Sequence, residues 1–132
     1  MPTTFKVWSV MQNIGTYFEI PVENLDRATQ FYRSVFGFEF TVNEIHGNQM
    51  AFFPFKEGVK GITGALAQGE VYKPSLTGTL IYLASDDIDA SVKKILESGG
   101  EVLFPKTEVP EYGWVAEFKD SEGNRVALFQ GI

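Results

Sequence analysis

The sequence contains no cysteine and only one histidine, His46. Without cysteine, the chain can form no disulfide, no thiolate metal site and no cysteine nucleophile. This histidine lies beside the predicted Gly47-Asn48 turn, so it gives no basis for assembling a Ser-His-Asp triad. The sequence has no G-x-S-x-G, P-loop or G-x-G-x-x-G motif. Several common classes of hydrolase and nucleotide-binding enzyme are therefore excluded at the outset.

Clusters of basic residues and long apolar runs are missing as well. The net charge is −6 over 132 residues, whereas a nucleic-acid partner would require a basic surface for phosphate contacts. No apolar run approaches the roughly 18 residues that a membrane span needs, and the N-terminus has no signal-peptide pattern. We therefore expect a cytoplasmic protein with no membrane or nucleic-acid partner. The acidity would suit a cationic ligand, although it more often serves only solubility.

The length suits one compact domain over residues 1–132. Aromatic residues make up 14% of the chain, and twelve of them are phenylalanine. Two interpretations follow: a phenylalanine-rich core, which is the more common use of aromatic residues, or a cavity lined by aromatic side chains.

An internal repeat organises the chain. The stretch from Gly15 to Phe40 has the pattern of a strand, a capped helix, a glycine stop and a second strand, and a weaker copy begins at Gly78. The matched residues fall at turns, caps and strand ends, where backbone geometry restricts the residue type: Gly15 with Gly78, Thr16 with Thr79, Asp26 with Asp89 and Gly37 with Gly100. The repeat predicts two modules, at about 14–66 and 78–132.

Each module has the pattern βαβββ. In the first module, Asn24 is a helix N-cap, Gly37 ends that helix, and Gly47-Asn48 is a hairpin turn. The strands are expected at 16–20, 38–46, 49–55 and 61–66, followed by a linker at 67–77. In the second module, Asp86 or Asp87 caps the helix, and strands are expected at 79–84, 101–104, 113–119 and 125–130, with a loop at 105–111. The alternation at 5–10 favours a short extra strand or an arm, where the exposed side of Trp8 would need cover from a second subunit.

This pattern predicts an α+β fold. Two βαβββ modules side by side would form a curved, mixed eight-stranded sheet, with helices on the convex face and a cavity on the concave face. Concave surfaces with a few convergent polar groups are the usual sites for small ligands.

Two segments resemble the vicinal oxygen chelate superfamily, which includes glyoxalase I, extradiol dioxygenases and the bleomycin- and fosfomycin-resistance proteins. They are V-x-N-L-x-R-A-x-x-F-Y at Val22–Tyr32 and D-x-x-G-N at Asp120–Asn124. The resemblance covers about residues 15–132. It implies paired βαβββ modules, a homodimer, a small-molecule ligand and a divalent metal ion in the concave cavity.

The metal positions that the resemblance implies are occupied by unsuitable residues. Family members typically carry His or Glu in the first strand of each module and Glu in the last. Here the corresponding positions hold Tyr17, Gly64, Leu80 and Ala127. Divalent metals prefer imidazole or carboxylate ligands, so no cofactor is expected, and glyoxalase I or dioxygenase activity is in doubt.

Strand alternation selects the side chains that should face the cavity. The predicted ligand-binding residues are Tyr17, Glu19, Phe52, Tyr82, Glu117, Arg125 and Phe129. Glu19 or Glu117 could act as a general base if burial raised its pKa. Alternatively, Glu117 and Arg125 form a structural ion pair between neighbouring strands.

His46 is the remaining candidate for catalysis. It could serve as a general base, or join Glu44 in a nonstandard metal site, because residues two apart share one face of a strand. Its position beside the Gly47-Asn48 turn also suits an exposed turn residue.

Three functional hypotheses remain. The first is a metal-independent protein that binds an aromatic or cationic small molecule. The second is a divalent-metal-dependent lyase or dioxygenase with nonstandard ligands. The third is a non-catalytic interaction module whose cavity is filled.

Overall fold

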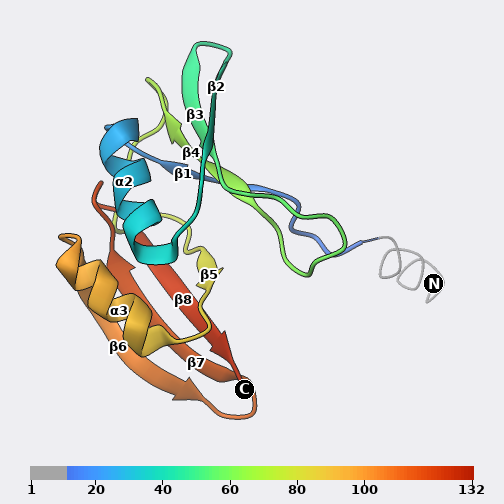
Figure 1. Cartoon of the computed structure of the whole chain (residues 1–132), viewed down its shortest axis with the longest axis vertical. Helices are drawn as coiled ribbons and strands as arrows, with labels where there is room; N and C mark the ends of the chain where they lie inside the picture. The colour runs from blue at the N-terminus through green and yellow to red at the C-terminus, as the bar shows by residue number, and fades with distance from the viewer. Residues whose placement is uncertain (1–11) are drawn as a thin grey trace.

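The computed structural model describes residues 12–132 and contains two βαβββ modules (Figure 1). The short strand or arm expected at 5–10 and Trp8 lie outside these residues. The first module comprises β1 (Phe18–Pro21), α2 (Leu25–Phe36), β2 (Thr41–Ile45), β3 (Asn48–Phe52) and β4 (Gly64–Gln68). The second comprises β5 (Tyr82–Ala84), α3 (Ile88–Glu97), β6 (Glu101–Val109), β7 (Gly113–Lys119) and β8 (Arg125–Gly131). The expected α+β fold and its tandem repeat of elements are confirmed.

The eight strands form two sheets rather than one continuous sheet. Their orders are β1-β4-β3-β2 and β5-β8-β7-β6. In each sheet the first strand pairs in parallel with the last strand of its module, and the other neighbours are antiparallel. Within the described residues, β1 and β5 lie at sheet edges and do not pair with each other, so the two modules of one chain do not share a sheet, a point that the sequence left open.

Local signals place both helices accurately. The Asn24 side chain accepts a hydrogen bond from the Arg27 amide, and Gly37 ends α2 with a φ of 76°, a conformation that glycine adopts without steric cost. Asp87 rather than Asp86 caps α3, because its carboxylate accepts from the Ala90 amide.

The expected loop at 105–111 is wrong for its first half. β6 continues through Pro105 to Val109 as the edge strand of its sheet, with register shifts on both sides of Phe104. Proline is compatible with an edge strand or a bulge, since no neighbouring strand requires its missing N–H. Neither helix in residues 12–132 is long and apolar enough to cross a membrane.

The two modules share one hydrophobic core between their helices and the facing sides of both sheets. Alternate residues of the strands enter it as predicted, including Ile20, Phe118 and Leu128. Most of the phenylalanine side chains pack here or at its edge, with ring centroids 4.9–6.5 Å apart in the first module. The phenylalanine-rich core is therefore the main use of the aromatic residues.

The turn at residues 120–124 joins the second module to the start of α2 in the first. Asp120 is buried, and one carboxylate oxygen accepts from the backbone amides of Glu122 and Asn124 at 2.8 and 2.9 Å. The other oxygen accepts from the Tyr32 hydroxyl at 2.7 Å. The Asn124 amide group donates to the carbonyl oxygen of Pro21 at 2.7 Å. The two segments that carry the family resemblance thus contact each other.

Glu122 completes this contact. One carboxylate oxygen accepts from the backbone amides of Glu23 and Asn24, and Arg27 donates to both carboxylate oxygens at 2.8–2.9 Å. A carboxylate at a helix N-terminus satisfies amides that have no partner within the helix and also interacts favourably with the helix dipole. The start of α2 is therefore fixed by a side chain from the other module.

We predict that Glu122 makes folding stability depend on pH. Burial alone would raise the pKa of its carboxyl, but hydrogen bonds from Arg27, Ser121 and the Asn24 and Glu23 amides lower it below the ordinary 4.5. A depressed pKa in the folded state stabilises the protein above the ordinary pKa, and this contribution is lost as the pH falls through the folded-state pKa. At neutral pH, Glu122→Gln should lower the free energy of unfolding by about 1–3 kcal/mol.

Denaturant titrations of the wild type and Glu122→Gln over a pH series would measure the difference in their free energies of unfolding. This difference should shrink at acidic pH. Glu108→Gln, at an exposed position of β6, is the control and should change stability by less than about 0.5 kcal/mol. A loss for Glu122→Gln that stays constant from neutral to acidic pH would contradict the assignment.

Candidate functional site

Glu19 lies between two tyrosines on the face of the first sheet opposite the helices. The Tyr17 hydroxyl donates to one carboxylate oxygen at 3.0 Å, and the Tyr72 hydroxyl donates to the other at 2.7 Å. We call Tyr17, Glu19 and Tyr72 the Tyr–Glu–Tyr cluster. Both carboxylate oxygens are occupied by neutral donors, so the position of the charge is fixed without being neutralised.

Strand register places an apolar surface beside this cluster. Glu19 pairs with Ala65 of β4, which in turn pairs with Phe52 of β3, so these side chains form a row across one face of the sheet. Tyr72 and Phe52 pack over a buried floor of small or flexible side chains: Met50, Ala65 and Ala67. The result is a carboxylate beside a shallow, partly aromatic surface.

The tyrosines of the cluster remain neutral over a wide pH range. Burial, followed by the hydrogen bond to Glu19 and its charge, raises the pKa of Tyr17 to about 12. The pKa of Tyr72 is raised chiefly by its hydrogen bond to Glu19. Both hydroxyls therefore stay protonated and act as hydrogen-bond donors at neutral pH.

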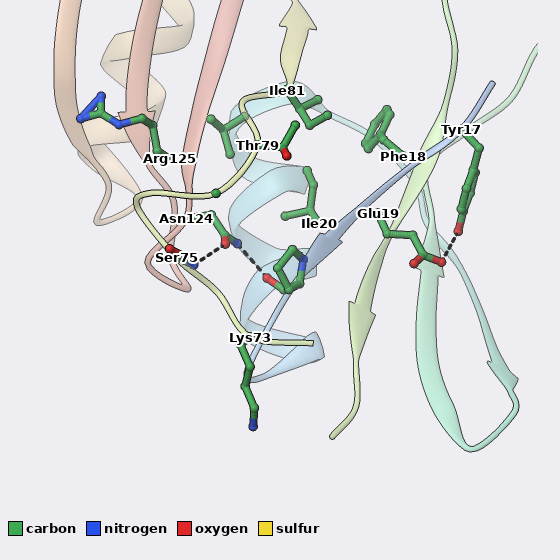
Figure 2. Close-up of a pocket in the computed structure, with 13 residues that line it drawn as sticks. Tyr17, Phe18, Glu19, Ile20, Lys73, Ser75, Thr79, Ile81, Asn124 and Arg125 are labelled. Carbon is green, nitrogen blue, oxygen red and sulfur yellow. Dashed lines mark hydrogen bonds between the residues drawn. The ribbon is translucent and has the colours of Figure 1, made fainter. Parts of the chain in front are cut away.

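A groove of about 330 Å³ runs between β1 and the segment that connects the modules. Tyr17 and Glu19 lie on one side of it, as Figure 2 shows, and Ser75, Thr79 and Arg125 lie on the other. The Asn124 side chain holds the connecting segment in place by accepting from the Ser75 amide at 3.1 Å. The groove is lined by both apolar and polar residues and is open to solvent.

The second module contributes a separate polar pair. Arg125 donates to Glu117 at 2.6 Å, which is the ion pair that the sequence offered as an alternative to a catalytic Glu117. Val115 pairs with Phe129 and Glu117 with Ala127 between β7 and β8. In Figure 2, Arg125 points away from Glu19 and Tyr17. Within one chain, the predicted ligand-binding residues therefore form two groups.

Tyr82 belongs to a second groove. This groove, of about 540 Å³, lies between β5 and the loop that connects β3 to β4. Its lining includes Phe53, Phe55 and Tyr82, and Tyr82 is half exposed. Phe18 and Ile81 line both grooves, but no residue of the Tyr–Glu–Tyr cluster lines this one.

The residues at the family metal positions do not fit a metal ion. Leu80 and Ala127 have no donor atom, and Ala127 is completely buried. At Gly64 even a Cβ atom would overlap the carbonyl oxygen of Phe18, so no ligand side chain could occupy this position without a backbone shift. Tyr17 donates its hydroxyl hydrogen to Glu19. In residues 12–132, no three His, Cys, Asp or Glu side chains are grouped so that they could hold a metal ion.

His46 lies in the β2–β3 turn with a φ of 52°, at the end of the hairpin that extends away from the second module (Figure 1). It is exposed, and Glu44 accepts a hydrogen bond from Gln49 at 3.1 Å. The two residues are near each other, but both lie away from the grooves that border β1 and β5. The structure thus agrees with an exposed turn residue at position 46.

Sequence reasoning missed Tyr72, which joins the cluster from the segment expected to be a plain linker. The only signal was an aromatic residue in a stretch otherwise rich in polar residues, glycine and proline. It also missed the role of Asn124, whose side chain orders that segment through Ser75. Hydrogen-bond partners so far apart in sequence cannot be found from local pattern.

The chain belongs to the Glyoxalase/Bleomycin resistance protein/Dioxygenase superfamily, whose family model matches residues 15–128. CFP32 of Mycobacterium tuberculosis, named as a candidate glyoxylase, is 26% identical over 122 residues, which are 90% of this chain and 46% of CFP32. The chain therefore spans about half the length of this curated relative.

Solved structures share the fold. TnmS3, an antibiotic-binding protein from Streptomyces sp. CB03234, matches with a TM-score of 0.68 and 24% identity, covering 93% of this chain and 99% of TnmS3. A glyoxalase I from Zea mays matches with a TM-score of 0.68 and 22% identity, covering 86% of this chain and 44% of that enzyme. At these identities, the likeness concerns the fold alone.

We predict that Glu19, together with burial, raises the pKa of Tyr17. In an alkaline titration followed by phenolate absorbance, the difference between wild type and Tyr17→Phe should report a group with a pKa near 12. Glu19→Gln should move this titration toward the ordinary value of 10.0, because it removes the negative charge beside the phenol. Glu117→Gln is the matched control and should leave it unchanged. Circular dichroism at each pH would verify folding, and an unaltered Tyr17 titration in Glu19→Gln would contradict the prediction.

Proposed function

We propose that this chain is a metal-independent binding protein that holds a small organic molecule against the Tyr–Glu–Tyr cluster. The observation that carries the proposal is the contrast between two sets of residues. The family metal positions hold side chains without suitable donors, whereas the adjacent sheet face keeps an ordered carboxylate and two aromatic hydroxyls. A ligand would use the aromatic surface for apolar contact and the cluster for polar contact.

The open groove beside β1 also favours binding over an interaction module with a filled cavity. TnmS3, whose fold this chain shares, is an antibiotic-binding protein, and that role is compatible with this site. Glu19 is exposed and is held by hydrogen bonds from Tyr17 and Tyr72, an arrangement suited to positioning a ligand. We therefore favour binding over general-base catalysis.

We further propose that the protein acts as a homodimer. Residues 12–17 and the β3–β4 loop project together from the body of the chain (Figure 1). They expose several large apolar side chains: Ile14, Phe55, Val59 and Ile62. Exposed apolar surface of this extent is characteristic of an interface. In such a dimer, the second module of the partner chain could also lie opposite the Tyr–Glu–Tyr cluster.

Metal content would test the central proposal. The purified protein should contain no stoichiometric divalent metal, even after incubation with excess Zn²⁺, Ni²⁺, Mn²⁺ or Fe²⁺ followed by desalting, and these ions should not raise its melting temperature. A thermal-shift screen of small aromatic and cationic compounds should yield ligands that do, because binding to the native state alone stabilises it. A tightly held metal ion at one per chain, or a screen without any ligand, would overturn the proposal.

The dimer gives an independent prediction. Light scattering coupled to size exclusion should give the mass of two chains for the wild type, and Phe55→Asp should shift it toward one chain because a charge would be buried in the interface. Val71→Asp is the control, since Val71 is equally apolar and exposed but lies in the connecting segment. A monomeric wild type, or equal effects of both variants, would argue against this interface.

A further inference from the structure

The Tyr–Glu–Tyr cluster has features that favour one class of ligand. Glu19 is exposed, and in residues 12–132 no lysine or arginine forms an ion pair with it. Glu117, the acidic residue among the predicted ligand-binding residues of the second module, is already paired with Arg125 at 2.6 Å. The two carboxylates therefore differ: one is compensated within the chain, and the other is held in place with its charge uncompensated.

The geometry around Glu19 suits a protonated amine. A carboxylate accepts about four hydrogen bonds, and the two tyrosine hydroxyls use one on each oxygen. Since both hydroxyls donate to Glu19, their own oxygen lone pairs remain available as further acceptors. An ammonium group has only donors, so it matches this set of acceptors, whereas a carboxylate or phosphate ligand would be repelled.

The surrounding side chains suit an apolar or aromatic group attached to that amine. Tyr72 and Phe52 pack over the buried side chains of Ala65 and Ala67, so an aromatic surface lies beside Glu19, which itself lines the groove next to β1. Aromatic rings also attract a cation through their π faces. Lys73 borders the same groove, but it points away from Glu19 (Figure 2) and does not occupy this place.

We propose that the Tyr–Glu–Tyr cluster is the recognition site for a protonated amino group on an aromatic or other apolar ligand. This inference rests on the proposed binding function and adds the ligand class. Glu19 accepts hydrogen bonds from the ammonium group, Tyr17 and Tyr72 hold its carboxylate in position, and Phe52 contacts the apolar part of the ligand.

Three probes of matched size separate charge from shape: benzylamine, which is protonated at neutral pH, benzyl alcohol and benzoate. Affinities would be measured by protein NMR titration of the full chain. Benzylamine should bind about tenfold or more tightly than benzyl alcohol, because a charge-assisted hydrogen bond is stronger than a neutral one. Benzoate should bind most weakly, and the preference for benzylamine should fall at high salt.

Variants would assign the preference to Glu19. Glu19→Gln keeps the shape and removes the charge, so benzylamine should lose about tenfold in affinity while benzyl alcohol changes by less than about twofold. Glu108→Gln, at an exposed position of β6 that lines neither groove, is the control and should leave both affinities unchanged. The double variant Tyr17→Phe, Tyr72→Phe keeps the Glu19 carboxylate but removes the two hydrogen bonds that hold it in position. It should therefore reduce benzylamine affinity by a smaller factor than Glu19→Gln does. Circular dichroism would establish that each variant is folded.

The outcomes distinguish this inference from the proposed function. If the thermal-shift screen finds ligands, but benzylamine has no advantage over benzyl alcohol or Glu19→Gln retains that advantage, the ligand class is wrong and the binding function stands. If neither the probes nor the screened compounds bind, both proposals fail. Resonance changes confined to residues distant from β1 would also overturn the assignment of the site.

Discussion

The contact between the 120–124 turn and the start of α2 is the interaction on which the rest of the structure depends. Asp120 is buried and shared among the turn amides, Asn124 and the Tyr32 hydroxyl. Glu122 satisfies the first amides of α2 from the other module. Buried polar groups are costly unless fully hydrogen-bonded, so this set of partners strongly restricts how the two modules can be placed relative to each other.

The relative placement of the two modules determines which side chains lie together on the sheet faces opposite the helices. Because the helices and the facing sides of both sheets form one core, the opposite sheet faces are directed outward, and the strands remain in two sheets. The Tyr–Glu–Tyr cluster therefore belongs to the first module, and the Glu117–Arg125 pair to the second. The Asn124 side chain links this arrangement to the site, because it also orders the segment from which Tyr72 reaches Glu19.

Much of the fold could be predicted because its signals are local. Asn24 and Gly37 fix the ends of α2 through cap geometry, and the alternation along β7 and β8 assigns the core-facing residues. The predictions failed at Pro105 and Tyr72, where contacts with other parts of the chain override local sequence preference. Pro105 is accommodated within β6 because that strand is an edge and its register shifts nearby. Tyr72 could not be assigned from a segment without periodicity, since its partner Glu19 is distant in sequence.

The sequence by itself determined the superfamily and the paired βαβββ modules, because both follow from residue identity at local positions. Tyr17, Leu80 and Ala127 lack suitable donors in any arrangement of the modules. Only the tertiary structure decided that Glu117 is paired while Glu19 is held by two neutral tyrosines. The physical reason is that charge compensation depends on distances between side chains from different strands and loops, which no local pattern specifies.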